Sequence, residues 1–227
     1  NVLIRSRYPG EERDANGDQG QTTCEGGGAM QLPVGIILAG GRARRMGGLD
    51  KAFLTLGDKF LVEHVIERIE GQVAGLAISA NGDPDRFMEF GLPVLSDSVS
   101  GQPGPLAGVL AGLDWAHRVG AQHVVSTAAD TPFFPLDLVE RLERAAHRAK
   151  TPIALAATQE GGRTTRHPTF GIWPVTLRHD LRSALEGGLR KVTLWTDSHG
   201  AATTAFDDHT VFNINTPEDL TQAEAML

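Results

Sequence analysis

The hydrophobic positions change their spacing several times along the chain, and these changes predict alternating strands and helices. Val34–Ala39 is a continuous apolar run that ends in glycines, as in a parallel strand buried on both faces. Over Leu61–Ile69 the apolar positions instead recur at helical spacing, and Leu106–Leu113 repeats this pattern. Val124–Thr127 predicts a further strand, and the next helix begins near Pro135.

This alternation predicts one fold class. It is typical of an α/β domain in which a mostly parallel, twisted sheet lies between two layers of helices (αβα), with a Rossmann-like nucleotide-binding half. After Thr151 the alternation loosens, and the expected elements are strands near residues 153–156 and 169–172 and helices near residues 177–185 and 217–226. Ligands of such sheets bind beyond the carboxyl ends of the strands, so the functional residues should follow the strands.

The start of the chain differs from the rest in composition. Residues 1–29 are rich in glycine and charge and have almost no apolar periodicity, which predicts a flexible tail, a tag or a mis-called start. Met30 stands immediately before the first convincing strand, so we expect a single domain over residues 30–227. Within it, residues 30–150 are expected to bind a nucleotide and residues 151–227 to form the acceptor half.

Composition and charge narrow the class of protein. A chain of 227 residues with 41% hydrophobic and 22% charged residues is ordinary for a globular protein. The formal net charge of −7 argues against general nucleic-acid binding, so a bound anion must be held by a local group of basic side chains. The single cysteine, Cys24, fits a reducing cytosol. With no secretory signal and no apolar run long enough for a bilayer, we expect a cytoplasmic protein without membrane contact.

The first strand leads into a loop rich in glycine and basic residues, over residues 38–51. Glycines let the backbone approach an anion closely, and consecutive N–H groups form an anion-binding concavity. Guanidinium and ammonium groups suit phosphate oxygens, and the loop carries four of them: Arg42, Arg44, Arg45 and Lys51. A surface loop with solvated arginines explains the same composition equally well. The glycine spacing matches neither the Walker motif nor G-x-G-x-x-G, which disfavours a dehydrogenase.

The order of the residues in this loop carries more information than its composition. Leu38-Ala39-Gly40-Gly41, then Arg45-Met46-Gly47-Gly48, then Asp50-Lys51 closely resembles the signature of the molybdenum cofactor guanylyltransferases. Four later segments resemble further motifs of that family in the same order: Asp97 with Gly104–Gly108, Ala129–Pro132, His167–Phe170 and Phe212–Leu220. The resemblance covers essentially everything from Val34 onward.

The resemblance implies an enzyme that transfers GMP from GTP, with Mg²⁺, to the terminal phosphate of molybdopterin or Mo-molybdopterin and releases pyrophosphate. It implies that Arg45, Lys51 and Asp130 are catalytic, with both basic side chains neutralising the triphosphate and Asp130 holding the metal. It also implies that the backbone at residues 38–41 lines the nucleotide, through Leu38, Ala39, Gly40 and Gly41. From the residue alone, a cap of the helix near Pro135 is the favoured explanation of Asp130, and the co-linear motifs of the resemblance reverse that preference.

Two further residues are candidates for nucleotide recognition. Asp97 follows the strand expected at residues 93–95, and a carboxylate can accept from the N1–H and N2–H₂ donors of guanine. The resemblance implies that Asp97 and Asn81 both contact the nucleotide. Asn81-Gly82-Asp83-Pro84 is also a good turn sequence, and the two interpretations of Asn81 weigh equally.

The acceptor half offers weaker candidates. Gly104 and Gly108 are expected to let the backbone approach the acceptor, and Asn213 and Asn215 are expected to contact the acceptor or a second metal. The run from Asn215 onward also reads as a helix start, with Thr216 as its cap.

Two alternatives remain open at this point. One is a sibling nucleotidyltransferase that uses CTP or a sugar phosphate. The other is a non-catalytic accessory protein that binds a nucleotide or pterin and hands the cofactor on. In either case molybdoenzyme chaperones or apoenzymes are conceivable partners, and nucleic acid is not an expected one.

Overall fold

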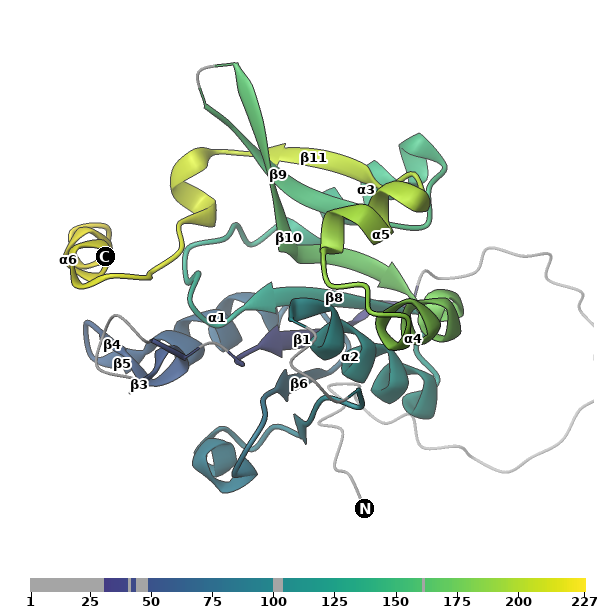
Figure 1. Ribbon diagram of the computed structural model, residues 1–227. Coiled ribbons are helices and arrows are strands. Elements are labelled where there is room, and N and C mark those ends of the chain that lie inside the picture. Colours follow the sequence, from purple (N-terminus) through teal and green to yellow (C-terminus); the bar gives the residue numbers. More distant parts are fainter. Residues whose placement is uncertain (1–30, 41, 44–48, 100–103, 161) are drawn as a thin grey trace, which may run out of the picture.

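A central seven-stranded sheet organises the computed structural model, which describes residues 31–40, 42–43, 49–99, 104–160 and 162–227 (Figure 1). Strand β10 is antiparallel to both of its neighbours, and all other adjacent pairs are parallel. The predicted mostly parallel sheet is therefore confirmed. From one edge to the other the strands are β11 (Ala202–Phe206), β9 (Ala154–Glu160), β10 (Arg163–Pro174), β8 (His123–Ala128), β1 (Val34–Leu38), β6 (Leu76–Ser79) and β7 (Val94–Leu95).

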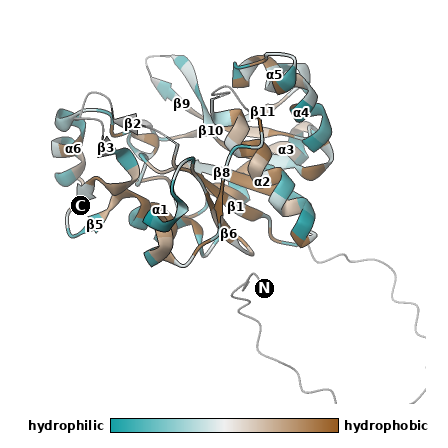
Figure 2. Ribbon diagram, turned by 60° about the horizontal axis from the view of Figure 1, so that its bottom comes forward, coloured by the Kyte–Doolittle hydropathy of each residue, from teal (hydrophilic) through white to brown (hydrophobic). Residues whose placement is uncertain are grey.

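Helices cover both faces of the sheet, as the αβα prediction requires. Along β1 the side chains alternate between the faces: Ile37 packs in one buried apolar cluster and Ile36 in the other. The first cluster includes α1 (Leu61–Ile69) and α3 (Leu138–Ala149), and the second includes α2 (Pro105–Val119), α4 (Arg178–Glu186) and α5 (Val192–Ser198). Figure 1 shows α2, α4 and α5 in front of the sheet, and Figure 2 shows apolar residues concentrated in the central strands and in α2.

Short elements join the first strand to the first helix. Two-residue strands form two small ribbons, β2 (Arg42–Ala43) with β3 (Leu49–Asp50), and β4 (Thr55–Leu56) with β5 (Lys59–Phe60). Between the ribbons lies the 3₁₀ helix η2 (Lys51–Phe53). The remaining helices outside the two layers are the 3₁₀ helices η3 (Pro84–Phe90), η4 (Val175–Leu177) and η5 (Asp208–Val211), and the C-terminal α6 (Pro217–Glu224). None of the helices in the described part of the chain is both long enough and apolar enough to cross a membrane.

Helix α2 packs so closely against the sheet that two of its positions, Gly108 and Gly112, have little or no room for a Cβ. A Cβ at Gly108 would lie 2.6 Å from Leu38 Cδ2 and 2.6 Å from Ser79 Oγ, and one at Gly112 would lie 3.2 Å from Ile36 Cγ2. Gly108 is buried on the side of α2 that faces the sheet and is not open to a substrate. The expectation that Gly108 contacts the acceptor is thereby corrected: this glycine serves helix-on-sheet packing.

The second half of the chain departs most from the sequence expectation. The strand expected near residues 169–172 begins earlier, at Arg163, and pairs with β9 as an antiparallel hairpin whose register shifts between His167 and Gly171. Its first residues are polar and exposed or half-buried, so no apolar pattern marks them. Neither β11 nor α5 was expected. Both are short and contain several polar residues, so the few buried residues form no recognisable apolar pattern.

We predict that Gly108→Ala destabilises the protein. Overpacking against Leu38 and Ser79 costs about 1–3 kcal/mol, which exceeds the gain of about 1 kcal/mol that alanine brings to a helix interior. The free energy of unfolding from urea titration measures the difference. Gly71→Ala is the control, because a Cβ at Gly71 meets nothing within 4 Å. Equal stabilities of the two variants would contradict the close packing of α2.

Candidate functional site

The carboxyl ends of the central strands bring the predicted residues to one edge of the sheet. Strand β1 lies between β6 and β8, so the chain leaves β1 on one side and returns on the other, which is the arrangement of a ligand-binding switch point. Here Ala39 N–H donates to Ser79 O at 2.8 Å, and Ala129 N–H donates to Leu38 O at 3.1 Å. The residues directly after β1, β6 and β8 are thus held side by side by main-chain bonds.

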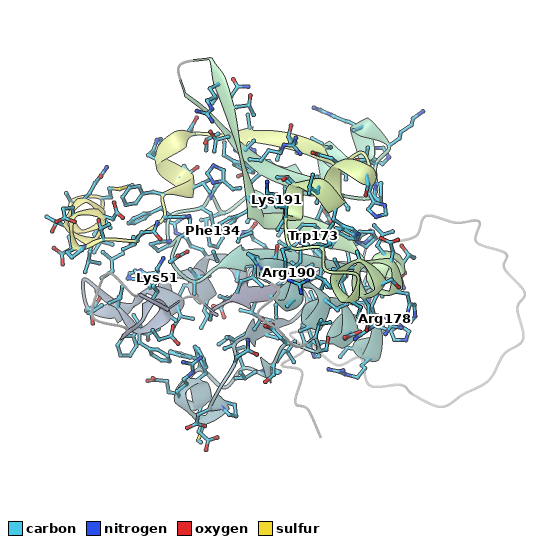
Figure 3. The ribbon with its side chains drawn as sticks, in the orientation of Figure 1. Lys51, Phe134, Trp173, Arg178, Arg190 and Lys191 are labelled. Atoms are coloured by element: carbon cyan, nitrogen blue, oxygen red, sulfur yellow. The ribbon has the colours of Figure 1, made fainter. Side chains whose placement is uncertain are left out.

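The most specific feature of this edge is a contact between Lys51 and Asp130. Lys51 Nζ lies 2.9 Å from Asp130 Oδ2, and the two side chains are 16% and 20% exposed. Lys51 Nζ also donates to Asn215 Oδ1. The local fold places Lys51 because Asp50, the N-cap of η2, accepts from Ala52 N–H at 3.2 Å and fixes the first turn. Figure 3 shows Lys51 on the side of the sheet where β1 and β8 end.

The loop before α6 completes this cluster. Ile214 N–H donates to Asp130 O at 2.8 Å, and Thr131 Oγ1 donates to Asn213 Oδ1 at 2.5 Å. Thr216 caps α6 in a capping box with Asp219, as the helix-start interpretation predicted. Asn213 and Asn215 therefore share one cluster with Lys51 and Asp130. An acceptor contact for either amide stays a prediction.

The structure decides between the two interpretations of Asp130. The N-cap position of α3 is occupied by Asp137, so the capping interpretation of Asp130 is wrong. Its carboxylate contacts Lys51, and its second oxygen lies 3.4 Å from Thr131 Oγ1. Asp130 is thereby free of a structural duty in the helix that follows.

Asn81 and Asp97 bond to each other across the ends of β6 and β7. Asn81 Nδ2 donates to Asp97 Oδ2 at 2.8 Å, and Asp97 N–H donates to Asn81 Oδ1 at 3.0 Å. The turn that follows is served by Asp83, which accepts from Asp85 N–H at 3.0 Å as the N-cap of η3. The amide of Asn81 is therefore engaged with the second predicted nucleotide contact and not with the turn.

Other predicted residues are placed less centrally or not at all. Leu38 is the last residue of β1 and Ala39 follows it, one residue earlier than the expected strand end. Gly40 is exposed, with open space where a Cβ would stand. Gly104 is the N-cap of α2 with φ of 75°, a conformation that favours glycine. Gly41 and Arg45 lie outside the described residues.

One residue of the site was missed by the sequence analysis. Arg86, on η3, donates from Nη1 to Asp50 Oδ2 at 2.5 Å and from Nη2 to Asn81 O at 3.0 Å. No local pattern could have indicated it, because Arg86 lies in an irregular segment and its acid partner is 36 residues away in the chain.

The oxygen atoms of the Lys51–Asp130 cluster fit a magnesium ion that is completed by a substrate. Mg²⁺ prefers hard oxygen ligands and is often bound by one or two carboxylates together with phosphates and water. Asp130 supplies a carboxylate, and the amide oxygens of Asn213 and Asn215 lie in the same cluster. No three His, Cys, Asp or Glu side chains gather as a metal cage within the described ranges. Asp130 is thus the residue of the site best suited to hold the ion.

Comparison with known proteins finds a matching family and similar sequences. Residues 35–201 match the MobA-like NTP transferase domain. A protein of Bradyrhizobium sp. (strain ORS 278) named molybdenum cofactor guanylyltransferase is 50% identical over 198 residues, covering 85% of this chain and 92% of that protein.

Two solved structures are similar at much lower identity. Molybdopterin-guanine dinucleotide biosynthesis protein A of Archaeoglobus fulgidus has a TM-score of 0.64 at 22% identity, over 85% of this chain and 97% of that one. The 4-diphosphocytidyl-2C-methyl-D-erythritol synthase of Anaerococcus prevotii has a TM-score of 0.69 at 13% identity, over 86% of this chain and 96% of that one. These likenesses show the fold alone.

We predict that a carbodiimide reagent joins Lys51 to Asp130 in the free protein. The ammonium and carboxylate lie 2.9 Å apart, so an activated carboxyl group meets the amine without any movement of the chain. Peptide mass spectrometry identifies the new amide bond. The exposed Lys59–Glu67 pair, at 2.6 Å, is the internal positive control. A cross-link at the control pair but none between Lys51 and Asp130 would contradict the contact.

Proposed function

The chain belongs to the MobA-like NTP transferase domain family, and from this premise we propose that it is a molybdenum cofactor guanylyltransferase, the activity named for its relative at 50% identity. Its substrates are then GTP and molybdopterin, or Mo-molybdopterin. The observation that carries the proposal is the Lys51–Asp130 contact at 2.9 Å, at the switch point of the sheet. A cation and a carboxylate in direct contact at this place suit a triphosphate and its metal ion.

The reaction is a displacement at the α-phosphorus of GTP. An oxygen of the acceptor's terminal phosphate forms a bond to the α-phosphorus. The bond from the α-phosphorus to the oxygen that bridges to the β-phosphate breaks. The electron pair leaves with pyrophosphate. The acceptor phosphate is already ionised near neutral pH, so the protein needs neither a nucleophile of its own nor a covalent intermediate. Positioning and charge neutralisation then account for most of the catalysis.

Lys51 and Asp130 divide this work. Lys51, on its short helix, is placed to neutralise charge that builds on the leaving pyrophosphate. Asp130, with the amide oxygens of Asn213 and Asn215, would hold Mg²⁺, which supplies charge neutralisation of the triphosphate when bound. Lys51 Nζ contacts the carboxylate of Asp130 and the amide oxygen of Asn215, two of the oxygens that would hold the ion. Arg45 remains a predicted second basic group for the triphosphate.

Guanine recognition is assigned to the other end of the site. Asp97 is held by the main chain after β7 and by the amide of Asn81, so its carboxylate is oriented before a nucleotide arrives. Oriented acceptors favour guanine, which presents two donor groups on its pairing edge. Backbone lining by residues 38–41 stays part of the proposal.

Three further features of the protein stay predictions from the sequence. They are a cytoplasmic location, docking to molybdoenzyme chaperones or apoenzymes, and a single domain from residue 30 onward.

We predict that Asp130→Asn abolishes most of the turnover. Asparagine keeps the shape but loses the charge that holds the ion, so kcat should fall by about a hundredfold or more while GTP binding weakens much less. Release of pyrophosphate with molybdopterin as acceptor measures kcat, and calorimetry measures binding. Asp58→Asn, on the exposed β4–β5 turn, is the matched control. Unchanged turnover in Asp130→Asn would favour the non-catalytic carrier instead.

We predict that Asp97→Ala lowers the preference for GTP. Without the acceptor, kcat/KM for GTP should fall about tenfold or more relative to that for CTP, because the donors of guanine lose their partner. Asp85→Asn, exposed on η3, is the control. A native enzyme that prefers CTP would keep the fold and mechanism but assign the protein to the cytidylyl-transferring alternative.

A further inference from the structure

Arg86 joins the two parts of the proposed site, which are otherwise carried by separate strands. One part is Lys51 with Asp130, beyond β1 and β8, and the other is Asn81 with Asp97, beyond β6 and β7. The Arg86 guanidinium contacts both segments. Nη1 donates to Asp50 Oδ2 at 2.5 Å, and Nη2 donates to Asn81 O at 3.0 Å.

The contact with Asp50 acts on the helix that carries Lys51. Asp50 uses its other carboxylate oxygen to accept from Ala52 N–H at 3.2 Å, and its side chain is only 16% exposed. Arg86 thus fixes the side chain of Asp50, the N-cap of η2. Asp50 in turn stabilises the first turn of that helix, which carries Lys51. A charge-assisted bond of this kind is short and directional, so it fixes the carboxylate in one orientation.

Aromatic packing supports the same connection. The guanidinium carbon of Arg86 lies 4.8 Å from the ring centroid of Phe87, which is fully buried. The Phe87 ring in turn lies 4.9 Å, centroid to centroid, from Phe53 at the end of η2. Phe53 also lies 6.3 Å, centroid to centroid, from Phe90 on η3. The segments of η2 and η3 are therefore joined by the Arg86–Asp50 ion pair and by packing of aromatic rings.

The contact with Asn81 acts on the segment proposed to read the base. Arg86 holds the main-chain carbonyl of Asn81, and the Asn81 side chain makes two bonds to Asp97. Arg86 Nε is buried and finds no partner among the described residues, a cost that the two outer nitrogens must offset.

We infer that Arg86 is a positioning residue that couples guanine recognition to the catalytic lysine. This inference rests on the proposed function, because it gives Arg86 no contact with substrate and lets it act through Asp50 and Asn81. Its two bonds require a planar fork with nitrogens pointing in different directions. Lysine, with one compact ammonium group, cannot reproduce both.

The first experiment tests the connection without any substrate. Amide hydrogen exchange is followed by NMR at Ala52 and Asp97, whose N–H groups are bonded to Asp50 and Asn81. In Arg86→Met both amides should exchange about tenfold faster, while the amides of β8 stay protected. Arg68→Met is the control, since Arg68 also donates to a main-chain carbonyl, Phe134 O at 3.0 Å, but its hydrogen bond involves neither Asp50 nor Asn81.

The second experiment tests the consequence for the reaction. Arg86→Met should lower kcat with GTP about tenfold and lower the ratio of kcat/KM for GTP over CTP about tenfold, since both arms are lost. Arg86→Lys should recover one of these effects but not both. In Asp97→Ala, adding Arg86→Met should leave the nucleotide ratio unchanged, because the base contact is already gone.

Distinct outcomes overturn the inference and the proposed function. Faster exchange at only one of the two amides, or an unchanged nucleotide ratio with a uniform loss of active enzyme, would reduce Arg86 to a structural ion pair. Full recovery of both effects by Arg86→Lys would show that charge alone suffices. A native protein that forms no guanylated product would refute the function, while the exchange experiment would still decide whether Arg86 couples the two segments.

Discussion

The contact between Lys51 and Asp130 is the interaction on which the rest of the site depends. It joins residues 79 positions apart in the chain, and it exists because β1 and β8 are adjacent parallel strands that end together. Each residue gives the other an opposite charge in a place with limited access to water. Without its partner, either charge would lose much of its stabilisation. In the proposed function, a triphosphate would give Lys51 an anionic partner and Mg²⁺ would give Asp130 a cationic one, so neither charge would be left unpaired.

Several features of the fold serve this edge of the sheet. Gly108 and Gly112 let α2 lie close against the sheet. Gly108 packs against Leu38 and Ser79, the last residues of β1 and β6. The capping box of α6 fixes the loop that carries Asn213 and Asn215. The acidic character of the whole chain makes these local arrangements necessary, because its net field repels a nucleotide and only placed cations attract one.

Much of this could be read from the sequence, for a physical reason. Buried parallel strands are continuous apolar runs, and the residues that follow them meet at one edge, so the position of Lys51, Asp97 and Asp130 at this edge was predictable. Their proposed roles came from the family resemblance and not from the local pattern. Strand direction was not found, because the polar start of β10 carries no signal and its pairing with β9 is made by the backbone. Arg86 was missed because its role depends on contacts between segments distant in the chain. The prediction for Gly108 was wrong because the sequence does not distinguish a glycine that lets a substrate approach from one that lets a helix pack against a strand.

The way in which Arg86 contacts Asn81 has a consequence for the evolution of base preference. Its bond is to a main-chain carbonyl, a group that any residue at position 81 would provide. Substitutions at positions 81 and 97, the proposed base contacts, would therefore leave the bond from Arg86 to the cap of η2 in place. Drift toward another nucleotide would then proceed through viable intermediates, each with its lysine still in place.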